Sequence, residues 1–188
     1  MMARFRLISC ATVLSATVAQ ANDWSDQFSR AVELPAHRWL AEQRATRGTP
    51  AEFTTDGCSG GMSSLWTFVA EHYPAFSDAH GGIPPWEGCC VTHDRAYHDA
   101  GPDPDPDASY DARLDADKAL RLCVKGTASL RDSVLMQEYG MSEAQVRAAY
   151  DAISVSMFQA VRLGGGPCTG LPWRWGYGYP QCWQSSSE

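Results

Sequence analysis

The chain of 188 residues has no long hydrophobic run beyond its N-terminal region, no internal repeat and no segment with the apolar–polar alternation of a strand. The missing run excludes a transmembrane segment from the mature chain, and the missing alternation argues against a sheet-based core. Basic residues are also few, 15 against 22 acidic ones. This balance argues against nucleic acid as a partner and against strong attraction to anionic lipid surfaces.

What is present at the N-terminus is typical of a leader. Two arginines precede the apolar run 7–18, and an A-x-A cleavage pattern ends at Ala21. We therefore predict a signal peptide at 1–21 and a single exported domain, secreted or periplasmic, at 22–188. A lipoprotein-like box ends at Cys10, but it comes before most of the apolar run instead of after it, which disfavours lipidation.

Cysteine is the next informative residue. One of the seven leaves with the leader, and an even set in an exported chain predicts disulfides. The six that remain are Cys58, Cys89, Cys90, Cys123, Cys168 and Cys182.

The remaining patterns predict an all-α, mainly helical domain. Apolar residues at helical spacing, with turn signals between them, predict helices at about 24–46, 62–73, 84–101, 108–125, 130–139 and 142–163. Pro35 marks a kink or break in the first, and Ser142 with Gln145 forms a capping box for the last. A loop is expected between Pro74 and Ile83.

The helix at 84–101 concentrates the reactive residues. His93 and Asp94 are adjacent and therefore point about 100° apart. Cys89 lies one turn before His93, and Cys90 one turn before Asp94, so each helix face carries one cysteine and one polar group. A zinc site built from His93 and His98 is excluded, because their spacing is five and zinc-binding histidines on one helix need four.

The next helix supplies a partner for the histidine. If the two helices are antiparallel and Cys89 pairs with Cys123, Asp117 faces His93. A buried carboxylate on one imidazole nitrogen fixes the tautomer, and the other nitrogen is left free to take a proton from water.

Asp94 has a different expected neighbour. If Cys90 pairs with Cys58, it faces the glycine-rich loop 56–61, whose carbonyl oxygens are exposed. A carboxylate opposite such a loop is an oxygen-only site suited to calcium.

Two segments can be interpreted either as structural or as functional. The proline-spaced acidic segment 101–107 is interpreted as a stiff connector in preference to a cation site. By elimination, Cys168 and Cys182 close an aromatic C-terminal loop, whose rings are interpreted chiefly as packing, although exposed Trp and Tyr suit a lipid–water interface.

The pattern C-C-x-x-H-D-x-x-Y at 89–97, with Asp117 six residues before Cys123 and the loop 56–61, resembles the secreted phospholipase A2 family. The resemblance implies a core of two antiparallel, disulfide-linked helices, a calcium loop and hydrolysis of the sn-2 ester of glycerophospholipids at a membrane or micelle interface. It implies these roles: His93 as general base, Asp117 and Tyr97 as its support, Asp94 and Asp56 as calcium carboxylates, and Gly57, Ser59 and Gly61 as carbonyl donors.

One departure from the family supports the alignment. Family members often carry a bonded cysteine pair at the positions of Ala96 and Ala116, and here both are alanine. Two other functions stay open: a catalytically silent module of the same type that binds lipid, calcium or a protein, and an esterase of different substrate class.

Overall fold

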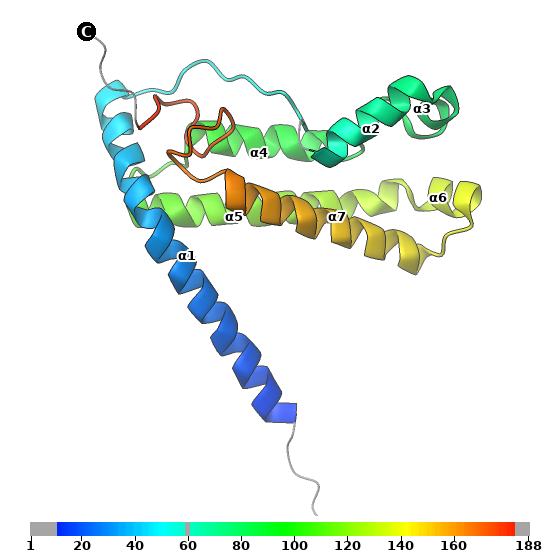
Figure 1. Ribbon diagram of the computed structural model, residues 1–188, viewed down its shortest axis with the longest axis horizontal. Helices are drawn as coiled ribbons and strands as arrows, with labels where there is room; N and C mark the ends of the chain where they lie inside the picture. Colours follow the sequence, from blue (N-terminus) through cyan, green and yellow to red (C-terminus); the bar gives the residue numbers. More distant parts are fainter. Residues whose placement is uncertain (1–10, 59–60, 183–188) are drawn as a thin grey trace, which may run out of the picture.

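The computed structural model describes residues 11–58 and 61–182, with the backbone alone for 11–25 and 61–62. Helices without strands make up the regular structure of these ranges, which confirms the helical prediction (Figure 1). They are α1 (Ala11–Arg47), α2 (Gly61–His72), α3 (Pro74–His80), α4 (Glu87–Asp99), α5 (Pro106–Gly126), the 3-10 helix η1 (Thr127–Leu130), α6 (Asp132–Tyr139) and α7 (Glu143–Gly164).

Helices α4 and α5 form an antiparallel pair. Ala100 adopts the left-handed conformation that ends α4, and Asp105 caps α5 by accepting hydrogen bonds from the amides of Asp107 and Ala108. The short connector between these caps reverses the chain. A disulfide joins Cys89 to Cys123 across the pair, as expected.

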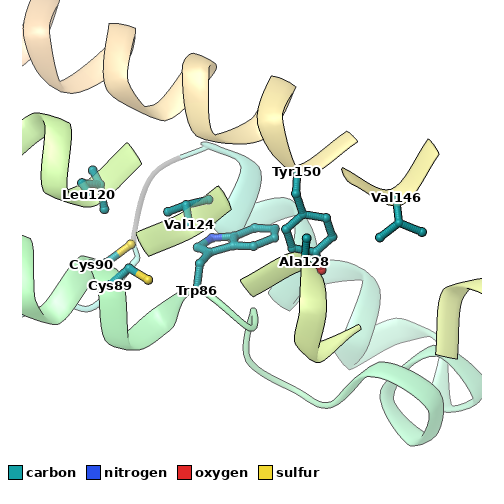
Figure 2. Close-up of a cluster of buried hydrophobic side chains, with 8 residues drawn as sticks. All are labelled: Trp86, Cys89, Cys90, Leu120, Val124, Ala128, Val146 and Tyr150. Atoms are coloured by element: carbon teal, nitrogen blue, oxygen red, sulfur yellow. The ribbon is translucent and has the colours of Figure 1, made fainter. Parts of the chain in front are cut away.

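Helix α7 lies along α5 (Figure 1). The predicted capping box between Ser142 and Gln145 is present at its start. Between α4, α5 and α7 the indole of Trp86 is buried against Val124, Ala128 and Tyr150 (Figure 2). This cluster fixes the first turn of α4.

Helix α1 continues through Pro35, so of the kink or break that the sequence suggests there is no break. Its first half projects away from the other helices, and its second half crosses the start of α5 (Figure 1). Arg30 pairs there with Asp107 and Asp111 of α5. Asp107, which belongs to the acidic segment 101–107 of the sequence analysis, therefore serves in an ion pair.

Two short segments remain, and the first of them differs from the prediction. Pro74 begins α3 where the sequence suggests a loop, because proline suits the first turn of a helix. The C-terminal loop is closed by the Cys168–Cys182 disulfide, and Trp175 and Tyr179 are buried in it, as the packing interpretation requires. Within the described ranges, no helix is long and apolar enough to cross a membrane.

Candidate active site

The structure brings His93, Asp117 and Tyr97 together between α4 and α5. His93 Nε2 lies 2.8 Å from Asp117 Oδ1, and the Tyr97 hydroxyl donates to the same oxygen over 2.7 Å. Asp117 is fully buried. Because Nε2 is held by a carboxylate, Nδ1 is the imidazole nitrogen left to exchange a proton with a ligand.

A network of charged residues surrounds the back of Asp117. Arg162 of α7 donates from Nη1 to Asp117 Oδ2 over 3.0 Å and from Nη2 to Glu33 Oε1 over 2.6 Å. Arg113 pairs with the other oxygen of Glu33 and donates from Nε to the Tyr97 hydroxyl over 3.2 Å. Two guanidinium groups and two carboxylates therefore alternate behind the histidine.

This alternation sets the charge states of the network. Burial alone would raise the pKa of Glu33, but the His37 imidazole, whose Nε2 lies 3.8 Å from Glu33 Oε2, and the charges of Arg113 and Arg162 lower it. Burial, together with the charge of Asp117, raises the pKa of Tyr97 well above its ordinary value. Tyr97 therefore stays a neutral donor to Asp117 at any physiological pH.

Sequence reasoning missed Glu33, Arg113 and Arg162. Arg113 had one usable signal, since it lies four residues before Asp117 and so shares its helix face. Glu33 and Arg162 are 129 positions apart in the chain, and no local pattern brings them together.

His93 lines a cavity of about 710 Å³. Its walls are mostly apolar and come from α4, α5, α7 and the C-terminal loop: Leu120, Met157, Ala160, Val161, Leu171 and Trp173. Asp94, Asp56 and Gly57 also line it, so the cavity is apolar along one side and carries carboxylates close to the histidine. An elongated hydrocarbon chain with a polar end matches this distribution.

The loop before α2 is attached to α4 at the level of Asp94. The Thr55 hydroxyl donates to Asp94 Oδ2 over 2.5 Å and accepts from the Gly57 amide over 2.9 Å. The Cys58–Cys90 disulfide, as expected, makes a covalent link beside this contact. The loop therefore faces Asp94 as the sequence predicts.

Glu87, the first residue of α4, also contacts the loop. Its Oε2 accepts from the Cys58 amide over 3.3 Å, and its carboxylate packs against Gly57. Gly57 has a φ of +66°, and a Cβ atom there would overlap Glu87 Oε1. The positive φ favours glycine, and a larger residue would also displace the Glu87 carboxylate from the loop.

The carboxylates give this end of the cavity a negative field. Burial raises the pKa of Asp94, and the charges of Asp56 and Glu87 raise it further, against the opposing effects of Thr55 and His93. Hard oxygen donors in a negative field are the donor set that calcium prefers, so the residues fit the ion. Among the described residues, no group of three or more His, Cys, Asp or Glu side chains is close enough to hold a metal without backbone donors.

The three residues predicted to bind calcium through their carbonyl oxygens differ in where the structure places them. Gly57 lies in the loop beside Asp94. Gly61 is the first residue of α2, so its carbonyl oxygen belongs to a helical turn and not to the loop. Ser59 lies outside the described residues.

Comparison of the chain with protein-family models, with curated proteins and with solved structures found no match.

Proposed function

We propose that the protein is a calcium-dependent phospholipase A2 that hydrolyses the sn-2 ester of glycerophospholipids. The observation that carries this proposal is the His93–Asp117 pair on the wall of a largely apolar cavity, beside the carboxylate of Asp94. The resemblance of the α4 motif to secreted phospholipases A2 agrees with it. Three disulfides support export to an oxidising compartment.

In the proposed reaction, His93 Nδ1 removes a proton from a water molecule as the water oxygen attacks the ester carbonyl carbon. Asp117 holds the tautomer through Nε2 and stabilises the imidazolium that forms. The same imidazolium then returns the proton to the departing glycerol oxygen, which leaves a free fatty acid and a lysophospholipid.

Asp94 has the second role. With Asp56 and the carbonyl of Gly57, it would hold calcium, and a bound calcium ion polarises the ester carbonyl and stabilises the developing negative charge. Thr55 and Glu87 position these groups by fixing the loop against α4. The apolar wall of the cavity receives the acyl chain and keeps bulk water away from it.

The test uses a phosphatidylcholine with two distinguishable acyl chains, incubated with calcium or with excess chelator. Release of the sn-2 chain alone, dependent on calcium, supports the proposal. Calcium binding by the disulfide-intact protein without release of either chain contradicts it and supports the silent binding module. Hydrolysis of simple esters without preference for phospholipid aggregates supports the alternative that the protein is an esterase of a different substrate class.

A further inference from the structure

A second, smaller pocket adjoins the candidate active site. It has a volume of about 260 Å³ and shares Asp56, Asp94 and Trp173 with the large cavity. The rest of its lining comes from two segments, Thr54 and Thr55 before the loop and Pro172 and Tyr177 in the C-terminal loop. A ligand whose reacting atoms lie near Asp94 can therefore extend into this pocket.

The frame of the small pocket is tied together by backbone hydrogen bonds. The Gly178 amide donates to the carbonyl of His98 at the end of α4, and the Gly178 carbonyl accepts from Ala51 over 2.7 Å. Figure 1 shows the C-terminal loop between α4 and the connection from α1 to α2. The Tyr177 hydroxyl donates to the Thr54 carbonyl over 2.7 Å, which fixes one aromatic wall.

The lining of this pocket combines two aromatic rings with two carboxylates and includes no basic side chain. Trp173 is 50% exposed, so its ring is only partly covered by protein. The nearby Arg95 is turned to another ring, with its guanidinium carbon 3.3 Å from the centre of the Phe53 ring. Aromatic faces together with carboxylates attract a cation whose surface is apolar.

The electrostatic surroundings agree with this composition. Burial raises the pKa of Tyr177, and the charges of Asp94, Asp56 and Asp99 add to the effect while Arg95 opposes it. With Glu87, which acts on Asp94, four carboxylates and one guanidinium exert their charges on Tyr177 or on Asp94, and of these only Asp56 and Asp94 line both pockets. A bound calcium ion would therefore leave the region with net negative charge.

We propose that the small pocket is a subsite for a quaternary ammonium group, which gives the site a preference for phospholipids with a choline head group. The choice of a phospholipid rests on the proposed function, whereas the recognition of the cation rests on the pocket itself. A quaternary ammonium suits the two rings better than a primary amine does, because its methyl groups contact aromatic faces without leaving N–H groups unpaired. An anionic head group meets two carboxylates and no basic side chain in this lining.

The first experiment measures binding without turnover. Choline is titrated into the calcium-loaded protein, and the indole N–H signal of Trp173 is followed by NMR. The matched control ligand is 3,3-dimethylbutan-1-ol, which has the shape of choline without its charge. We expect saturable shifts with choline and at least about tenfold weaker binding of the neutral alcohol, a difference of about 1.4 kcal/mol. Equal responses to the two probes, or no response to choline, overturn the proposal.

Variants then locate the subsite. Tyr177→Leu and Trp173→Leu each remove one ring and should weaken choline binding, whereas Tyr177→Phe keeps the ring and should retain it. Because Trp173→Leu lacks the indole reporter, isothermal titration calorimetry measures choline binding in all of these variants. Phe28→Leu, at an exposed aromatic of α1, is the control and should leave binding unchanged. Circular dichroism establishes which variants fold, and two independent ring deletions keep the test decisive if one of them does not. Unchanged choline binding in both folded ring deletions overturns the proposal.

The second experiment compares hydrolysis of lipids that differ only in head group. Phosphatidylcholine and phosphatidylglycerol with identical acyl chains are presented in neutral detergent micelles. We expect kcat/KM for the choline lipid to exceed that for the glycerol lipid by about tenfold, and the ratio to fall towards one in Tyr177→Leu. Equal rates in the unmodified protein overturn the subsite. Specific choline binding without hydrolysis of either lipid contradicts the proposed function and leaves the subsite standing.

Discussion

Arg162 donates a hydrogen bond from Nη1 to Asp117 Oδ2 over 3.0 Å, on the carboxylate oxygen that does not face the histidine. The guanidinium thereby stabilises a fully buried negative charge and aims its other oxygen at the imidazole. Since Arg162 also binds Glu33, the orientation of the His93–Asp117 pair depends on α1 and α7 as well as on the two helices that carry it.

Arg162→Met should leave Asp117 and Glu33 each short of a partner. Breaking a buried ion pair from one side costs about 3–5 kcal/mol, so we expect a decrease of that order in the free energy of unfolding measured in urea. The free energy of unfolding of Arg162→Lys should lie between those of Arg162→Met and the unmodified protein. An ammonium group keeps the positive charge of Arg162 but lacks the planar fork of the guanidinium. In folded variants kcat should decrease with little change in KM, since Arg162 does not line the cavity.

Arg147→Met is the matched control for that experiment. Arg147 lies on the same helix and pairs with Glu143 four residues away, but both side chains are largely exposed. Exposed ion pairs contribute about 0–1 kcal/mol to stability, so the free energy of unfolding of Arg147→Met should be close to that of the unmodified protein. A similar loss of stability in both variants would refute the importance assigned to the buried network.

His93→Gln should abolish most of the hydrolysis without unfolding the protein. Glutamine can still donate a hydrogen bond to Asp117, but it cannot accept a proton from water, and general base catalysis is worth about 10²–10⁴-fold in rate. The measurement is kcat on phosphatidylcholine micelles, with circular dichroism as the test of folding. His72→Gln, at an exposed position of α2, should retain full activity. Full activity of purified His93→Gln would remove His93 from the mechanism.

Glu33→Gln should lower the free energy of unfolding by an amount that depends on pH. The pKa of Glu33 is lowered in the folded state, so its contribution to stability is complete above its unfolded value of about 4.5 and is lost as the pH falls through the folded value. The difference in unfolding free energy between the unmodified protein and the variant should therefore be largest near pH 6–7 and shrink below about pH 4.5. Urea melts across this range measure it.

Glu143→Gln provides the control for acid stability. Its partner Arg147 is exposed, so the substitution should change the free energy of unfolding by less than about 1 kcal/mol throughout. A Glu33→Gln difference that stayed constant down to pH 3 would show that the carboxylate charge is not what stabilises the network.

Calcium should raise the unfolding temperature of the protein, and removal of the ion with a chelator should reverse the change. A ligand that binds only the folded state adds about 2.7 kcal/mol at a hundred times its Kd. Asp94→Asn should abolish the calcium-dependent part of this shift. Asp151→Asn, at an exposed pair with Lys125, should preserve it. An equal calcium shift in both variants would place the ion elsewhere.

Local patterns predicted the helices, because capping residues, apolar spacing and prolines act over a few residues of chain. They also predicted the approach of His93 to Asp117 and of the loop to Asp94, because paired cysteines restrict how two helices can face each other. The same reasoning failed for α3, where Pro74 starts a helix instead of preceding a loop.

Glu33, Arg162 and Glu87 could not be assigned from sequence for a physical reason. Each is a charged residue in an amphipathic helix, where a charge is ordinarily solvated, and only the tertiary fold brings its partner close. The small aromatic pocket has the same origin, since Thr54 and Tyr177 come from segments 123 residues apart.

The separation of Glu33 and Arg162 also has a consequence for biosynthesis. The two residues are 129 positions apart, and both bind the groups behind His93. A nascent chain that has not yet emerged beyond α7 lacks Arg162, so Asp117 cannot be fully paired until α7 has been synthesised. The region that orients the histidine is therefore assembled only after α7 has emerged, and a chain that stops before α7 carries His93 and Asp117 without the support that aligns them.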